Sequence, residues 1–168
     1  LILNGIISSH LDGVIPLFEE AGCNIKVRNS KLKIDSPNRL KPFKSVRTMP
    51  YPGFPTDAQA VMMSVATVAK GTTVFVENIF ESRYRHVEDL TRLGANIKVA
   101  NKVAVVEGVD RLFGAKVVAK ELRGAAALVV ASLKAEGRTE IEGIKYLERG
   151  YEDLEVVLSS LGANIRKV

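Results

Sequence analysis

The chain has 168 residues, of which 46% are hydrophobic, and this length allows one substantial core. Its 24 basic and 19 acidic residues give a net charge of +5, which favours anionic partners without distinguishing nucleic acid from small phosphates. The single cysteine, Cys23, excludes an internal disulfide, and no apolar run is long enough to span a bilayer. We expect one cytoplasmic domain. Because Leu1 is not preceded by a methionine or a basic signal segment, we also expect a processed product or a fragment.

One phrase recurs three times along the chain. Residues 21–27, 93–99 and 161–167 each carry a glycine, a small residue, Asn, Ile and a basic residue in that order, at intervals of roughly 70 residues. Each glycine follows an amphipathic helical pattern, over residues 11–20, 87–93 and 152–161 respectively. A strand is predicted after each phrase, so the chain reads as one supersecondary unit used three times.

Hairpins and buried helices complete this pattern. Alternating runs on either side of Asn29-Ser30 and of Asn101-Lys102 predict two hairpins, whereas the third phrase has no return strand. Residues 57–70 and 123–136 are apolar on nearly every helical face, which predicts two core helices. Strands are expected directly afterwards, over residues 72–76 and 139–144.

The segment before the first core helix reads YPGFPTD over residues 51–57. Two prolines stiffen this loop, and Thr56 and Gln59 have the spacing of a capping box. We therefore expect Thr56 to cap the helix and Asp57, as its first residue, to project a carboxylate toward a ligand. An ordinary helix-stabilising acid at this position is the alternative.

Comparing the repeats aligns four charged residues. Asp57 and Arg123 lie equally far before the glycines that end the core helices, and Arg83 and Arg149 lie equally far after them. Repeats around a common axis would bring these helix starts to one end of the domain, where guanidinium groups bind carboxylates or phosphates in pairs. Surface salt bridges are the alternative, of Arg83 with Glu81 or Glu88 and of Arg149 with Glu148 or Glu152.

Four segments resemble the UDP-N-acetylglucosamine enolpyruvyltransferases. They are YPGFPTD (51–57), Phe80-Glu81-Ser82-Arg83, ELRGAAALVVASL (121–133) and ERGYEDL (148–154), against the family's P-x-F-P-T-D, F-E-N-R, D-L-R-A-S-A-S-L and D-R-G-Y-E-D-L. The resemblance covers essentially the whole chain. It implies an inside-out α/β barrel domain of repeated βαβαββ units with pseudo-threefold symmetry. Residues 1–168 would form a single domain with a partial first repeat (1–45), a second (46–110) and a third (111–168) that lacks its final strand.

The resemblance also implies an activity. Such enzymes transfer the enolpyruvyl group of phosphoenolpyruvate to the 3′-hydroxyl of UDP-N-acetylglucosamine and release phosphate, in the first committed step of peptidoglycan synthesis. By matching motifs, Asp57 would be catalytic, holding that hydroxyl and receiving its proton. The implied substrate-binding residues are Asp57, Ile79 (through its backbone), Arg83, Glu121, Arg123 and Arg149. No cofactor and no metal are implied.

Several residues differ from the family's sequence motifs. Glu121 replaces an aspartate, Ala125 and Ala127 replace serines, and Tyr146 stands where many relatives have histidine. Cys23 is expected to be a packing residue, because the family's reactive cysteine lies on a loop of a companion domain. Without that domain, we expect the chain to be inactive.

Two other functions compete with this one. The first is an enolpyruvylshikimate-phosphate synthase of the same fold. The second is a nucleic-acid-binding module that uses the basic connector of Arg39, Lys41, Lys44 and Arg47, although only Phe43 is interleaved there as an aromatic. His10 and His86 lack partners at a metal-ligand spacing, and His86 is expected to be structural or solvated. We favour small-molecule substrates, with no nucleic acid and no membrane as partner.

Overall fold

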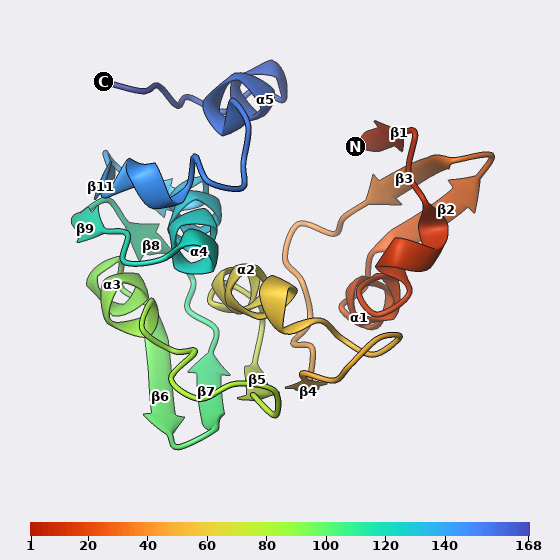
Figure 1. Ribbon diagram of the computed structural model, residues 1–168, viewed down its shortest axis with the longest axis horizontal. Helices are drawn as coiled ribbons and strands as arrows, with labels where there is room; N and C mark the ends of the chain where they lie inside the picture. Colours follow the sequence, from red (N-terminus) through yellow and green to blue (C-terminus); the bar gives the residue numbers. More distant parts are fainter.

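Two apolar helices, α2 (Thr56–Ala66) and α4 (Leu122–Ser132), pack side by side at the centre of the computed structural model, which describes residues 1–168 (Figure 1). Met63 and Leu128 are among the fully buried side chains where they meet the core. Both helices are buried as predicted, but each ends earlier than predicted. After Ala66, the Thr67 hydroxyl donates to the Ser64 carbonyl and the chain turns. After α4, the chain leaves the helix to form β10 (Ala135–Glu136).

A four-stranded sheet covers one side of α2. It consists of β4 (Ser45–Arg47), β5 (Thr72–Val76), β6 (Asn96–Ala100) and β7 (Val103–Glu107), in the order β4-β5-β7-β6. β4 is parallel to β5, and the other two pairings are antiparallel. With α2 and α3 (Val87–Arg92) as connections, the segment has the βαβαββ order that the resemblance implies. The predicted strand 72–76 and the predicted hairpin across Asn101-Lys102 are both confirmed.

The N-terminal segment has the connectivity of the second half of that unit. It consists of β1 (Ile2–Asn4), the 3-10 turn Ser8–Leu11, α1 (Ile15–Glu20), β2 (Asn24–Arg28) and β3 (Lys31–Asp35). β3 pairs antiparallel with both β1 and β2, which confirms the hairpin across Asn29-Ser30. The helix starts later than predicted because Pro16 fits only the first turn of an α-helix.

The C-terminal segment repeats the first half of the unit. β9 (Lys116–Val118) pairs parallel with β11 (Glu140–Glu142), as β4 does with β5, and β8 (Leu112–Phe113) pairs parallel with β10. The 3-10 turn Ile144–Tyr146 and α5 (Leu154–Ser160) follow. The strand predicted after the third phrase is wrong: residues 163–168 form none, since no strand lies beside them to pair with their backbone. The repeat boundaries stay a prediction.

The main core lies between the central helices and the sheet, and includes Phe43, Phe75, Leu90 and Leu93. Cys23 is buried, and burial raises the pKa of its thiol, so the prediction of a packing residue is confirmed. No helix combines the length and the apolar character that a membrane crossing requires.

Candidate functional site

The first turns of α2 and α4 bring Asp57 and Arg123 into direct contact. Arg123 Nε donates a hydrogen bond of 2.5 Å to Asp57 Oδ1, across a sequence separation of 66 residues. The repeat comparison predicts this proximity, since the two residues occupy equivalent helix starts. The hydrogen bond to Asp57 raises the pKa of the Arg123 guanidinium, which therefore stays protonated.

The pair keeps free hydrogen-bonding capacity. Asp57 Oδ2 and both terminal nitrogens of Arg123 make no hydrogen bond, and the Asp57 side chain is 66% exposed. A carboxylate oxygen accepts a hydroxyl proton, and a guanidinium fork donates to two oxygens of a carboxylate or phosphate. The arrangement can therefore hold a hydroxyl next to an anionic group.

Thr56 does not cap α2, so the predicted capping box is wrong. The helix begins at Thr56 itself, Pro55 is the residue before it, and Asp57 is the second helical residue. The Thr56 hydroxyl instead donates to Glu77 Oε2 at 2.9 Å, because a buried carboxylate is the stronger acceptor. Gln59 is buried in the core, with its Nε2 unpartnered, and does not reach back to the helix start.

Sequence reasoning missed Glu77, which organises the loop after β5. Its side chain is 1% exposed, and its Oε1 accepts from the Thr48 hydroxyl and from the Ile79 and Phe80 amides. The amide of Ile79 is thereby occupied, which leaves its carbonyl for a ligand. The sequence feature that could have indicated this role is a charged residue directly after the buried strand β5.

Glu121 caps α4. Its Oε2 accepts from the Arg123 amide at 2.9 Å, and its Oε1 accepts from the Gly124 amide. Both carboxylate oxygens thus serve the helix start that carries Arg123. In this structure Glu121 positions that turn, and its expected contact with substrate stays a prediction.

Neither of the other two arginines forms the salt bridges considered as alternatives. The Arg83 guanidinium lies 4.3 Å from the centre of the Phe80 ring, and Glu88 pairs with Arg92 and Lys120. The salt-bridge alternative is therefore wrong for Arg83.

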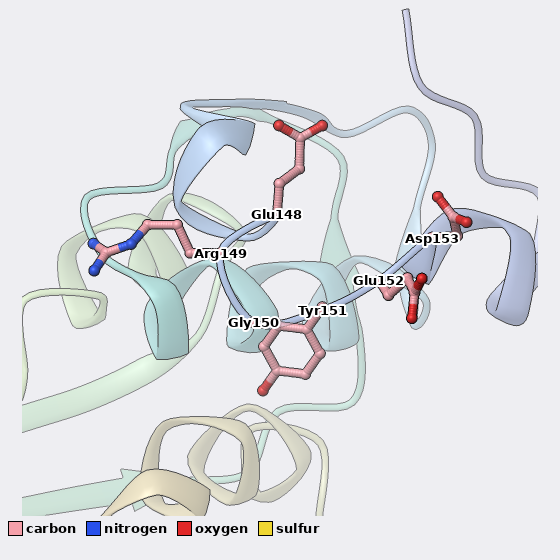
Figure 2. A pocket seen from close by; sticks show the side chains of 6 residues that line it. All are labelled: Glu148, Arg149, Gly150, Tyr151, Glu152 and Asp153. Carbon is pink, nitrogen blue, oxygen red and sulfur yellow. The ribbon is translucent and has the colours of Figure 1, made fainter.

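Arg149 is likewise unpaired, since Glu148 pairs with Lys167. Arg149 borders a hollow of about 430 Å³ that is lined by residues 148–153. The side chains of Arg149 and Tyr151 point in different directions there (Figure 2). No hydrogen bond or ion pair joins Arg83 or Arg149 to the contact between Asp57 and Arg123. Of the four aligned residues, the structure therefore brings only Asp57 and Arg123 into contact.

Tyr151 and His86 lie near the start of α4, which carries Arg123. Burial raises the pKa of Tyr151, and the nearby Arg123 opposes that rise. His86 is 4% exposed with both ring nitrogens unpartnered, and burial lowers its pKa to about 4, against the attraction of Glu121. His86 is thus structural, and the solvated alternative is wrong.

The basic connector is engaged in the fold. Arg39 donates to the carbonyls of Val68, Ala69 and Val109 and pairs with Asp110, while Lys44 pairs with Glu20. Two of the connector's four cations, Arg39 and Lys44, therefore have acidic partners within the chain. No group of three or more His, Cys, Asp and Glu side chains is arranged to hold a metal.

Comparisons with known proteins agree on one family. Residues 1–158 match the family described as EPSP synthase (3-phosphoshikimate 1-carboxyvinyltransferase). The chain is 47% identical to UDP-N-acetylglucosamine 1-carboxyvinyltransferase 2 of Caldanaerobacter subterraneus subsp. tengcongensis, over 96% of this chain and 39% of the relative. It is also 47% identical to the UDP-N-acetylglucosamine 1-carboxyvinyltransferase of Desulfofundulus thermocisternus, over 98% of this chain and 68% of the relative.

Solved structures share the fold. The enolpyruvyl transferase NikO from Streptomyces tendae has a TM-score of 0.86 at 28% identity, over 99% of this chain and 39% of that one. An EPSP synthase from Acinetobacter baumannii has a TM-score of 0.73 at 16% identity, over the same shares, and this likeness concerns the fold alone. The chain spans about 40% of the length of most of these relatives.

Proposed function

This chain belongs to the EPSP synthase family of carboxyvinyltransferases, and from that premise we propose that it carries part of the active site of a UDP-N-acetylglucosamine enolpyruvyltransferase. The complete enzyme would move the enolpyruvyl group of phosphoenolpyruvate to the 3′-hydroxyl of UDP-N-acetylglucosamine and release phosphate. This would be the first committed step of peptidoglycan synthesis.

The observation that carries the proposal is the contact between Asp57 and Arg123, with its unused donors and acceptor. Asp57 Oδ2 would accept the hydrogen bond of the sugar hydroxyl, and the terminal nitrogens of Arg123 would bind oxygens of phosphoenolpyruvate. The hydroxyl oxygen would then add to C2 of phosphoenolpyruvate as its proton passes to Asp57 Oδ2, while the C3 methylene gains a proton from solvent. Loss of a C3 proton together with departure of phosphate would restore the double bond and give the enolpyruvyl ether. Holding both reactants at one ion pair lowers the entropic part of the barrier.

The degree of similarity supports a choice of acceptor. The relatives at 44–47% identity are named for UDP-N-acetylglucosamine, whereas the EPSP synthases with solved structures are only 15–16% identical. We therefore propose a nucleotide sugar as the acceptor. Ile79, Arg83, Glu121 and Arg149 would complete the binding site, with Ile79 acting through its free carbonyl.

We further propose that a companion domain completes the enzyme. The relatives are mostly two and a half times as long, and the additional length would supply the loop with the reactive cysteine. A nucleotide sugar and phosphoenolpyruvate are cytoplasmic metabolites, so the cytoplasm is the proposed location.

The test is phosphate release by the full-length protein. We expect turnover with phosphoenolpyruvate and UDP-N-acetylglucosamine, and none when shikimate 3-phosphate replaces the nucleotide sugar. Turnover with shikimate 3-phosphate alone would instead support the enolpyruvylshikimate-phosphate synthase alternative. Absence of phosphate release with both acceptors would contradict the proposal.

A further inference from the structure

The carboxylate of Glu121 folds back over the first turn of α4. Its backbone is extended, with φ −163° and ψ 166°, and its two oxygens accept from the Arg123 and Gly124 amides. The usual capping side chains, Ser, Thr, Asp and Asn, are shorter. The additional methylene of a glutamate must therefore be accommodated somewhere above the turn.

Gly124 provides that space. A Cβ placed on Gly124 would lie 2.7 Å from Glu121 Oε1 and 3.0 Å from the Cβ of His86. Both distances are shorter than ordinary van der Waals contact. The Glu121 oxygen is the end of a flexible side chain, whereas the Cβ of the buried His86 is fixed to its backbone, so an alanine at position 124 would displace the Glu121 carboxylate from the helix start.

A glycine at this position otherwise weakens the helix. Glycine is the least favourable residue in a helix apart from proline, and it exposes backbone without adding contacts. Its presence here is accounted for by the Glu121 carboxylate, which lies where the Cβ of any larger residue would be.

We propose that Gly124 is a positioning residue, which allows Glu121 to cap α4 and thereby holds Arg123 against Asp57. The capping part concerns the fold of α4 alone. The consequence for substrate binding rests on the function proposed above, and the two parts have separate readouts.

The first readout is the Tm of the full-length protein in a double-mutant cycle of Glu121→Asp and Gly124→Ala. With Glu121 present, we expect Gly124→Ala to lower the Tm by about 2 °C, because the cap is displaced. With aspartate at position 121, we expect the same substitution to raise the Tm by about 1–2 °C, because alanine favours a helix. This reversal of sign would support the proposal. A shift of equal sign and size in both backgrounds would overturn it.

The second readout is the steady-state kinetics of the same four proteins. We expect Gly124→Ala to raise the KM for phosphoenolpyruvate about tenfold, since a small displacement of Arg123 weakens anion binding. The double variant should return to within about threefold of Glu121→Asp. An unchanged KM in Gly124→Ala would overturn the positioning role, whatever the Tm shows. If the wild-type protein releases no phosphate, the proposed function fails, and the Tm cycle still decides whether Gly124 accommodates the cap.

Discussion

At the scale of single residues, the contact between Asp57 and Arg123 is too exposed to serve the fold. Exposed ion pairs contribute about 0–1 kcal/mol, because water and salt screen them and ordering two side chains costs entropy. The Asp57 side chain is 66% exposed and the Arg123 side chain 30% exposed. Their pairing therefore matters mainly for how the two groups are presented to a ligand.

We predict that Asp57→Asn lowers kcat of the full-length protein about 100-fold or more, while its free energy of unfolding changes by less than about 1 kcal/mol. The amide keeps the shape of the side chain but loses the charge and the proton acceptor. Phosphate release and urea titration measure the two quantities. Asp35→Asn is the matched control, because Asp35 forms another exposed pair, with Lys33, within β3. A variant Asp57→Asn with wild-type kcat would contradict the catalytic role.

His86 predicts a dependence of stability on pH. Its folded pKa of about 4 lies below the ordinary value of 6.5, so the folded state binds its proton less readily than the unfolded state does. The stabilisation is complete above pH 6.5 and is lost as the pH falls from 6.5 toward 4. The loss from this residue should reach about 2–3 kcal/mol at pH 4.

Urea unfolding of this chain between pH 4 and pH 7 measures this effect. We expect His86→Gln, which does not titrate, to lose less stability than the wild type over that range. His10→Gln is the control, because His10 is exposed, and it should follow the wild-type curve. Parallel curves for the wild type and His86→Gln would show that His86 does not titrate as described.

Among the helices and strands, the local sequence pattern predicted the hairpins correctly but placed the ends of the helices poorly. Asn29 and Asn101 have positive φ angles of 47° and 54°, and asparagine tolerates that conformation, so the turns could be predicted. The start of α2 could not, because Thr56 is bound by Glu77 from another element. A capping box is a local rule, and a buried carboxylate from a distant strand end overrides it.

Glu77 therefore connects three segments, Thr48 directly after β4, α2 and the loop after β5, and we predict that this connection dominates local stability. Glu77→Ala should cost about 2–4 kcal/mol of unfolding free energy, since two amides and two hydroxyls lose their acceptor. Glu77→Gln should cost about 1 kcal/mol, since its oxygen can still accept from the two amides. Glu107→Gln, at the exposed end of β7, is the control and should stay within about 0.5 kcal/mol of wild type.

Urea titration gives these free energies, and hydrogen exchange gives the protection of the Ile79 and Phe80 amides. Both amides should exchange faster in Glu77→Ala than in Glu77→Gln. Equal protection in the two variants would mean that the carboxylate does not hold the loop.

At the scale of the whole molecule, the internal repeats predicted more of the site than any local motif did. They placed Asp57 beside Arg123, because equivalent helix starts meet where α2 and α4 pack. They did not predict the surroundings of His86 and Tyr151, which depend on how α3 and the 148–153 loop lie against α4. Repeat equivalence gives the position of a backbone, whereas burial and partners depend on side chains that differ among the copies.

Because the site is open to water, we predict that this chain alone does not turn over phosphoenolpyruvate and UDP-N-acetylglucosamine. The Asp57 side chain is largely exposed, and Arg83 and Arg149 are not drawn toward it, so water has free access to the reacting groups. Electrostatic stabilisation of a reacting anion is weak in such a wet site. The chain should show native circular dichroism and a cooperative unfolding transition, yet release phosphate at the background rate, while the full-length protein is active under the same conditions. Turnover by the folded chain within about tenfold of the full-length rate would mean that the exposed pair is sufficient for catalysis and that no companion domain is required.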